Sequence, residues 1–273
     1  MRILLADDQE EIRMLTTHQL ERTGHHVVAV SNGQEALDAI SREPFDVILL
    51  DEDMPVMTGP QALAAIRAQQ KPLVPKPLII ALTGYSSDPD RERLLRAGFD
   101  SVIGKPFRME ALNDFLQSLS PPTDLPPTSE RAAASPASTN TPIATLLSRV
   151  NGDETLARKM ITMFLRDTTK RMAALQHALQ NNDADSVASI SHALLGSISI
   201  FGAASAVNYG RQLQDSARSN DLSEALRLFP RLQEEIADLE ANLRGYAGQK
   251  RSPGPGASSN NKRRSANSKR TPR

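Results

Sequence analysis

The sequence contains no cysteine among its 273 residues. It therefore has no disulfide framework, no thiolate ligand for zinc and no cysteine nucleophile. Long apolar runs are missing too, because nowhere do the roughly 18 apolar residues of a membrane-spanning helix follow one another. The N-terminus has only a short apolar stretch before two acids, which fits neither a signal peptide nor a membrane anchor. We expect a cytoplasmic protein of two domains, since the chain exceeds the usual size of one.

The formal net charge is zero, but the charges are unevenly spread. The chain after Gln249 holds eight Lys and Arg residues and no acid, which leaves 24 basic and 32 acidic residues in positions 1–249, a net charge of −8. The composition of residues 247–273 predicts a disordered basic tail. Such a tail can contact nucleic acid through nonspecific charge. We do not expect a nucleic-acid-binding module there, because the tail has no aromatic residue and no fold.

Two apolar runs end in carboxylates. Val47 to Leu50 runs into Asp51, and Ile3 to Ala6 runs into Asp7 and Asp8. Unbroken apolar runs of this kind are typical of parallel strands that are buried on both faces. Neighbouring parallel strands would bring the three carboxylates to one edge of a sheet, where ligands bind in open α/β folds. Clustered like charges call for a cation, and hard oxygen ligands suit Mg²⁺.

Residues 1–119 alternate five predicted strands with five predicted helices, a pattern that indicates a parallel sheet with right-handed crossovers. The strands are expected at 3–6, 26–30, 47–50, 78–82 and 101–103, and the helices at 10–22, 32–44, 58–70, 88–97 and 109–119. Thr83 and Lys105 then follow the fourth and fifth strands, at the same edge as the acids. Together these groups suit phosphoryl transfer, with Asp51 as the nucleophile, Asp8 and Asp7 as metal ligands, and Thr83 and Lys105 as donors to the phosphoryl oxygens.

This pattern resembles the response-regulator receiver domain over residues 1–119. The matching positions are Asp7-Asp8, Asp51-x-x-Met54-Pro55-x-Met57-x-Gly59, Thr83 and Lys105-Pro106. The resemblance implies a flavodoxin-like α/β fold with strand order 2-1-3-4-5, an aspartyl phosphate on Asp51, and the backbone carbonyl of Asp53 as a further Mg²⁺ ligand. Two positions depart from the family. Val102 stands where an aromatic residue is frequent, and Gly84 stands where Ala is common.

A change of composition separates this part from the rest of the chain. Residues 120–142 are rich in Pro, Ser, Thr and Ala and have no apolar period, which predicts a linker. Residues 143–246 carry no strand signal. A short leading helix at 143–150 and four amphipathic helices at 153–180, 185–201, 203–219 and 222–243 predict an antiparallel four-helix bundle.

The helix that contains His192 is the informative one in the bundle. Its apolar residues, from Val187 to Phe201, recur at steps of three or four and cluster within about 80° on a helical wheel. His192 lies roughly 160° from the centre of that stripe, on an outer face that it shares with Gly196 and Ser199. We therefore expect the imidazole to project into water, with Gly196 leaving room for another surface to approach it. An exposed neutral imidazole is a competent nucleophile toward phosphorus, although a lone surface histidine ordinarily has no function.

The surrounding residues are similar to the histidine phosphotransfer (HPt) domain. The resemblance lies in His192-Ala193-Leu194-Leu195-Gly196-Ser197, with Phe201-Gly202-Ala203 and Leu213-Gln214 further along. It implies a phosphohistidine at His192 and a docking face that includes Leu195, Gly196 and Ser199. Leu195 departs from the family, which usually has Lys there, so a partner would have to supply the missing charge or Leu195 would add apolar contact to a docked receiver.

These features predict a two-component phosphorelay protein. Asp51 would take phosphate from a sensor histidine kinase with Mg²⁺, and His192 would carry it to or from a receiver domain. Nothing in the sequence resembles an ATP-binding kinase domain, so we expect a phosphoryl carrier and not a conventional enzyme. Two alternatives stay open, namely a bundle that serves only as a binding or dimerisation module, and a receiver that gates a DNA-binding tail. The sequence also leaves open whether Asp51 and His192 exchange phosphate within one molecule.

Overall fold

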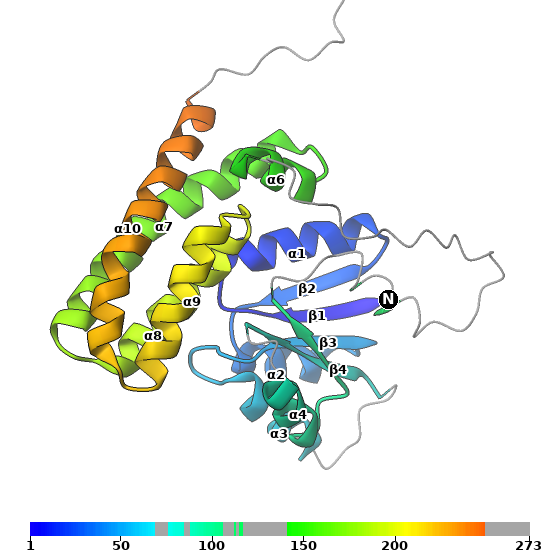
Figure 1. The fold of residues 1–273 in the computed structure, drawn as a ribbon. Coiled ribbons are helices and arrows are strands. Elements are labelled where there is room, and N and C mark those ends of the chain that lie inside the picture. Colours follow the sequence, from blue (N-terminus) through cyan, green and yellow to red (C-terminus); the bar gives the residue numbers. More distant parts are fainter. Residues whose placement is uncertain (69–75, 85–87, 106–111, 113–114, 117–140, 249–273) are drawn as a thin grey trace, which may run out of the picture.

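The N-terminal half of the computed structural model is an α/β unit built on one parallel sheet with the strand order β2-β1-β3-β4-β5 (Figure 1). This confirms the predicted fold class. The structure describes residues 1–68, 76–84, 88–105, 112, 115–116 and 141–248. The strands are β1 (Arg2–Ala6), β2 (His26–Val30), β3 (Val47–Asp51), β4 (Leu78–Thr83) and β5 (Ser101–Gly104).

The register of the sheet aligns the strand ends that carry polar residues. Leu50 of β3 pairs with Ala6 of β1, and Asp51 pairs with Leu82 of β4. Every residue of β3 is buried, as expected for a central strand that is covered on both faces. Asp7 therefore leaves the sheet one step beyond Ala6, beside Asp51.

Four helices of this unit are described, and their bounds lie within a few residues of the predicted ones. They are α1 (Glu10–Arg22), α2 (Gly33–Arg42), α3 (Gly59–Arg67) and α4 (Asp88–Arg96). Asn32 caps α2, because its side chain accepts a hydrogen bond from the backbone N–H of Glu35. The predicted helix at 109–119, the linker at 120–142 and the tail at 247–273 lie almost wholly outside the described residues.

The C-terminal half is helical, in agreement with the predicted bundle. It comprises α6 (Pro142–Arg149), α7 (Glu154–Gln180), α8 (Ala184–Ser199), α9 (Ala204–Arg218) and α10 (Leu222–Ala247). Short turns join α7 to α10, and left-handed residues such as Asn182 and Gly202 end two of the helices. None of the helices in the described ranges combines the length and the apolar character that crossing a bilayer requires.

The helix α1 joins the two halves. Figure 1 shows α1 between the sheet and the helices of the bundle. Leu20 packs with the sheet, whereas Ile12 and Leu15 belong to the apolar core of the bundle. The side-chain amide of Gln19 also donates a hydrogen bond to the carbonyl oxygen of Arg149 at 2.5 Å. The α/β unit and the bundle thus share a packed interface.

Candidate functional site

Three carboxylates gather at the end of the sheet. Asp7, Asp8 and Asp51 each offer an oxygen atom, and these atoms lie within 4.8 Å of one another. The ammonium of Lys105 lies 2.9 Å from Oδ1 of Asp51 and also forms an ion pair with Oδ2 of Asp7. The other oxygen of Asp7 accepts a hydrogen bond from the backbone N–H of Gln9 at 2.9 Å. Acids and an ammonium that the sequence assigned to three strand ends, those of β1, β3 and β5, therefore meet at one point.

Burial controls the charge of this cluster. Desolvation raises the pKa of Asp51 well above its ordinary value, and Lys105 offsets only part of that effect. Burial, together with the charge of Asp7, raises the pKa of Asp8 to about 6. Desolvation works to lower the pKa of Lys105, but the charges of Asp51 and Asp7 outweigh it and raise that pKa. The single positive charge of Lys105 therefore does not balance the three carboxylates of the pocket.

The oxygen atoms of the cluster fit a hard cation. Oδ1 of Asp8 and Oδ2 of Asp51 are buried and make no hydrogen bond with any described residue, while Oδ1 of Asp51 contacts the ammonium of Lys105. Buried carboxylate oxygens are otherwise almost always paired. Asp7 is already committed to Lys105 and Gln9, so Asp8 and Asp51 are the side chains best placed to coordinate Mg²⁺.

Thr83 and Asp53 have partners that the sequence did not reveal. The hydroxyl of the buried Thr83 donates a hydrogen bond to Oε2 of Glu52 at 2.6 Å, and Arg93 of α4 forms an ion pair with the same carboxylate. The side chain of Asp53 lies 3.3 Å from the guanidinium of Arg218, which belongs to α9 of the bundle. One ion pair therefore crosses from the loop after β3, beside the carboxylate cluster, to the bundle.

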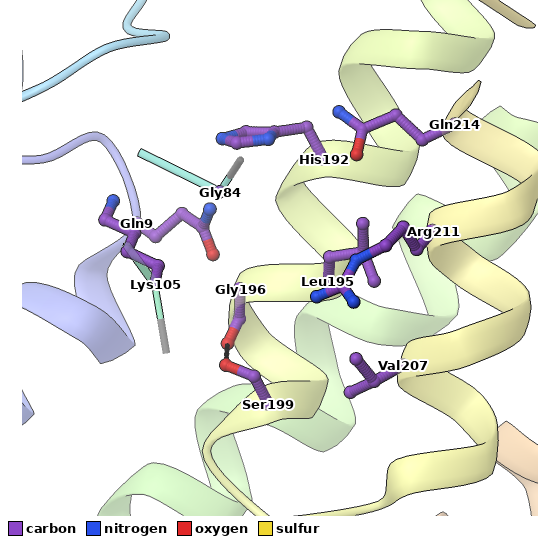
Figure 2. A pocket seen from close by; sticks show the side chains of 10 residues that line it. All are labelled: Gln9, Gly84, Lys105, His192, Leu195, Gly196, Ser199, Val207, Arg211 and Gln214. Carbon is purple, nitrogen blue, oxygen red and sulfur yellow. Dashed lines mark hydrogen bonds between the residues drawn. The ribbon is translucent and has the colours of Figure 1, made fainter. Parts of the chain in front are cut away.

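His192 does not project into water, and the prediction was wrong on this point. The imidazole is partly buried, with Nε2 covered and without a hydrogen-bond partner among the described residues. It lies outside the core of the bundle, as expected, but it faces the α/β unit (Figure 2). A Cβ atom on Gly84 would lie 3.1 Å from Cε1 of His192. The helical wheel placed the side chain on the correct face and could not reveal that another domain covers that face.

A cavity lies between the imidazole and Lys105, the ion-pair partner of Asp51. Lys105, which pairs with Asp51, lines the same cavity as His192, and Figure 2 shows them on opposite sides of it. The lining residues are Gln9, Gly84 and Lys105 from the α/β unit, and His192, Leu195, Gly196, Ser199, Val207, Arg211 and Gln214 from the bundle.

The environment of the imidazole favours its neutral form. Burial lowers the pKa of His192, the charges of Lys105 and Arg218 lower it further, and Asp53 opposes them. A neutral imidazole keeps a lone pair on one ring nitrogen, which is what a nucleophile needs.

The three residues expected on the docking face line the cavity. A Cβ atom on Gly196 would lie 2.1 Å from Oε1 of Gln9, so the absence of a side chain lets Gln9 reach the helix. Ser199 donates its hydroxyl to the carbonyl oxygen of Gly196 at 2.7 Å. Leu195 packs toward α9, since a Cβ atom on Gly210 would lie 3.0 Å from Cδ2 of Leu195.

Sequence reasoning gave no role to several residues of this cavity, among them Gln9, Arg211 and Gln214. Gln9 is 2% exposed and follows the acid pair, but a glutamine there carries no signal of its own. Arg211 has none either, because an arginine on an amphipathic helix is ordinarily a solvated surface residue. Gln214 was part of the quoted motif, and only the structure shows that its buried side chain lies beside His192 (Figure 2).

The comparisons with known proteins identify both halves. Residues 3–117 match the model of the response regulator receiver domain, and residues 159–242 match the model of the Hpt domain. The chain therefore contains a receiver domain followed by an Hpt domain, as the two resemblances implied.

Similar proteins include large sensors. The sensor protein EvgS of Escherichia coli O157:H7 is 26% identical over 90% of this chain and 20% of its own length. The virulence sensor protein BvgS of Bordetella parapertussis is 28% identical over 92% of this chain and 21% of its own length. Among solved structures, the receiver domain of the sensor histidine kinase PA1611 from Pseudomonas aeruginosa PAO1 is 34% identical. That match covers 43% of this chain and 94% of the solved chain, with a TM-score of 0.39. The chain spans about a fifth of the length of these two sensor proteins.

Proposed function

We propose that this chain is a phosphorelay protein in which a phosphoryl group passes between Asp51 and His192 of the same molecule. One observation carries the proposal: the imidazole of His192 lies in a cavity with Lys105, whose ammonium contacts Asp51. Because the receiver and Hpt sites already face each other, no second receiver is needed for the exchange.

The first step loads Asp51. A carboxylate oxygen of Asp51 attacks the phosphorus of a phosphohistidine on a sensor histidine kinase, a P–O bond forms, and the P–N bond to the donor imidazole breaks. Mg²⁺, held by Asp8, Asp51 and the backbone carbonyl of Asp53, neutralises charge on the phosphoryl oxygens when it is bound. Lys105 and Thr83 donate to the remaining oxygens.

The second step moves the group to the Hpt domain. The lone pair on Nε2 of His192 attacks the phosphorus, a P–N bond forms, and the P–O bond to Asp51 breaks, which returns the carboxylate. Nε2 is covered and has no competing hydrogen bond within the described chain, so it is free to react. Lys105 then pairs with the released carboxylate as before.

The chain acts as an acceptor and carrier of phosphate. The matched domains are the receiver and the Hpt domain, so we assign ATP-dependent phosphorylation to a separate histidine kinase activity. A receiver domain is the expected acceptor beyond His192, and we propose the cytoplasm as the place where these partners meet. We propose no role in nucleic-acid binding.

Labelling by a phosphorylated donor kinase tests this function. Wild type should be labelled at both sites, with the acid-labile, base-stable fraction on histidine. Asp51→Asn should lose both labels because His192 is loaded from Asp51, His192→Gln should lose only the acid-labile fraction, and chelation of Mg²⁺ should abolish both. An acid-labile fraction that survives His192→Gln would overturn the role of His192. One label per chain, confined to Asp51, would instead favour a bundle that only binds partners.

A further inference from the structure

The Hpt domain lacks a cation beside its histidine on the helix that carries it. Leu195, one turn after His192, is apolar and packs toward Gly210 of α9. A phosphoryl group on an imidazole carries nearly two negative charges at neutral pH. While the domains are docked, Lys105 of the receiver shares the cavity and can balance that charge.

Lys105 cannot serve once the receiver leaves. For His192 to meet the next acceptor, the receiver of this chain must move away and take Lys105 with it. Among the residues that line the cavity, the Hpt domain contributes a single cation, Arg211 of α9. Arg211 is thus the cation of the cavity lining that stays with the Hpt domain, whereas Arg218, whose charge also acts on His192, is paired with Asp53 in the docked chain.

The surroundings of Arg211 leave its guanidinium available. It forms no ion pair with any residue that the structure describes, in contrast to Arg218 on the same helix, which contacts Asp53. Arg171 of α7 is a weaker candidate, because it is committed to Ser197 and to the carbonyl oxygen of Ala193. Figure 2 shows the Arg211 side chain extending from α9 toward α8.

A second observation points to an anion in this cavity. Gln214 lies one turn after Arg211, on the same face of α9. Its side chain is 2% exposed, and Nε2 of its amide has no hydrogen-bond partner among the described residues. A buried N–H donor is nearly always paired, so an acceptor belongs at this position. Phosphoryl oxygens would supply one.

We propose that Arg211 binds the phosphoryl group on His192 and takes the place of a cation at position 195. The inference rests on the proposed function, since it assumes a phosphohistidine at His192. In this chain the cation belongs to α9 and not to α8. Arg211 is the neighbour of Gly210, against which Leu195 of α8 packs. A planar guanidinium suits this role because it can bind two phosphoryl oxygens at once.

Direct phosphorylation by phosphoramidate tests the inference without the receiver site. In the full chain with Asp51→Asn, Nε2 of His192 attacks phosphoramidate, the new P–N bond forms, and ammonia leaves with a proton. Adding Arg211→Ala should slow the labelling of His192 by about tenfold or more, the loss expected when a hydrogen bond between charged groups is removed. Arg211→Lys should recover most of the rate, and Arg227→Ala, at an exposed cation of α10, should leave it unchanged.

The outcomes separate this inference from the function on which it rests. Normal labelling of the Asp51→Asn chain together with an unchanged rate in Arg211→Ala would overturn the role of Arg211 alone. If Arg211→Lys labelled His192 as slowly as Arg211→Ala, the role of Arg211 would also be overturned, because restoring the positive charge would not restore the rate. Absence of any label on His192 in the Asp51→Asn chain would overturn both the role of Arg211 and the proposal that His192 is phosphorylated.

Discussion

At the scale of single residues, the two side chains proposed to bind phosphoryl oxygens both have partners within the α/β unit. Lys105 bridges Asp51 and Asp7, and Thr83 gives its hydroxyl to Glu52. For Thr83 to donate to a phosphoryl oxygen on Asp51, the hydrogen bond to Glu52 must break. Glu52 thus competes with the phosphoryl group for the hydroxyl of Thr83.

Removing this competitor should favour phosphorylation. A hydrogen bond of this kind contributes about 0.5–1.5 kcal/mol, so we expect Glu52→Ala to raise the steady-state occupancy of Asp51 by roughly three- to tenfold at limiting phosphodonor. Acetyl phosphate with Mg²⁺ and quantitative phosphate-affinity gels provide the measurement. Glu43→Ala, which removes a surface ion pair with Arg2, is the matched control. Equal or lower occupancy in Glu52→Ala would show that Glu52 does not restrain Thr83.

Gly84 governs how closely the imidazole approaches the receiver. A Cβ atom at this position would lie 3.1 Å from Cε1 of His192, which is tighter than ordinary contact. Gly84→Ala should therefore slow transfer from Asp51 to His192 several-fold, and Gly84→Val more strongly, while loading of Asp51 stays near wild type. Rapid-quench labelling resolves the two steps.

Gly245→Ala serves as the control for Gly84, because nothing lies within 4 Å of the added Cβ atom. If Gly84→Val transferred to His192 as fast as wild type, the observed approach of the two domains would not be the one that reacts.

At the scale of secondary-structure elements, the sequence predicted the order, type and approximate bounds of those described here. The helix predicted at 10–22 is α1, and the helix predicted at 32–44 is α2. These features are local, since they follow from periodicity and from hydrogen bonds within a few residues.

The packing partners of these elements were not predictable from the same patterns. Ile12 and Leu15 mark an apolar stripe on α1, but periodicity does not say that the stripe contacts the Hpt core. The prediction that His192 is exposed to solvent was wrong for the same reason. A helical wheel shows which residues face the bundle core, but it does not show whether another domain covers the opposite face. The pocket of the receiver could be predicted because the carboxyl ends of parallel strands meet at one edge of the sheet, independently of how the helices pack.

The packing of α1 should hold the two domains together. Leu15 is 8% exposed and belongs to the Hpt cluster, so a charge there would have to be buried or would separate the domains. The chain has no native cysteine, so Arg42→Cys and Glu234→Cys can carry spin labels on the receiver and the Hpt domain without interference. The docked chain should give a narrow distance distribution, and Leu15→Asp should broaden it.

The control for Leu15→Asp is Leu226→Asp. Leu226 is 49% exposed on α10, so the same substitution should leave the distribution narrow. A narrow distribution in Leu15→Asp, with both domains folded by circular dichroism, would contradict the role of α1 in docking.

At the scale of the whole molecule, His192 of the Hpt domain lies in a cavity that is also lined by Lys105, the partner of Asp51. The ion pair between Arg218 and Asp53, the contact of Gln9 with Gly196 and the packing of α1 all hold His192 over the receiver pocket. A tethered partner acts at a high effective concentration, which can reach the millimolar range for short flexible linkers. Transfer within one chain should therefore outcompete transfer between chains at ordinary protein concentrations.

The most direct test of transfer within one chain is to mix two variants that can exchange phosphate only between molecules. Asp51→Asn chains and His192→Gln chains are combined at low micromolar concentration with a phosphorylated donor kinase, and histidine label is followed beside wild type. We expect wild type to transfer from Asp51 to His192 at a rate that does not depend on its concentration, and the mixture to be slower by at least tenfold. A mixture as fast as wild type, with a rate that rises in proportion to concentration, would contradict transfer within the chain.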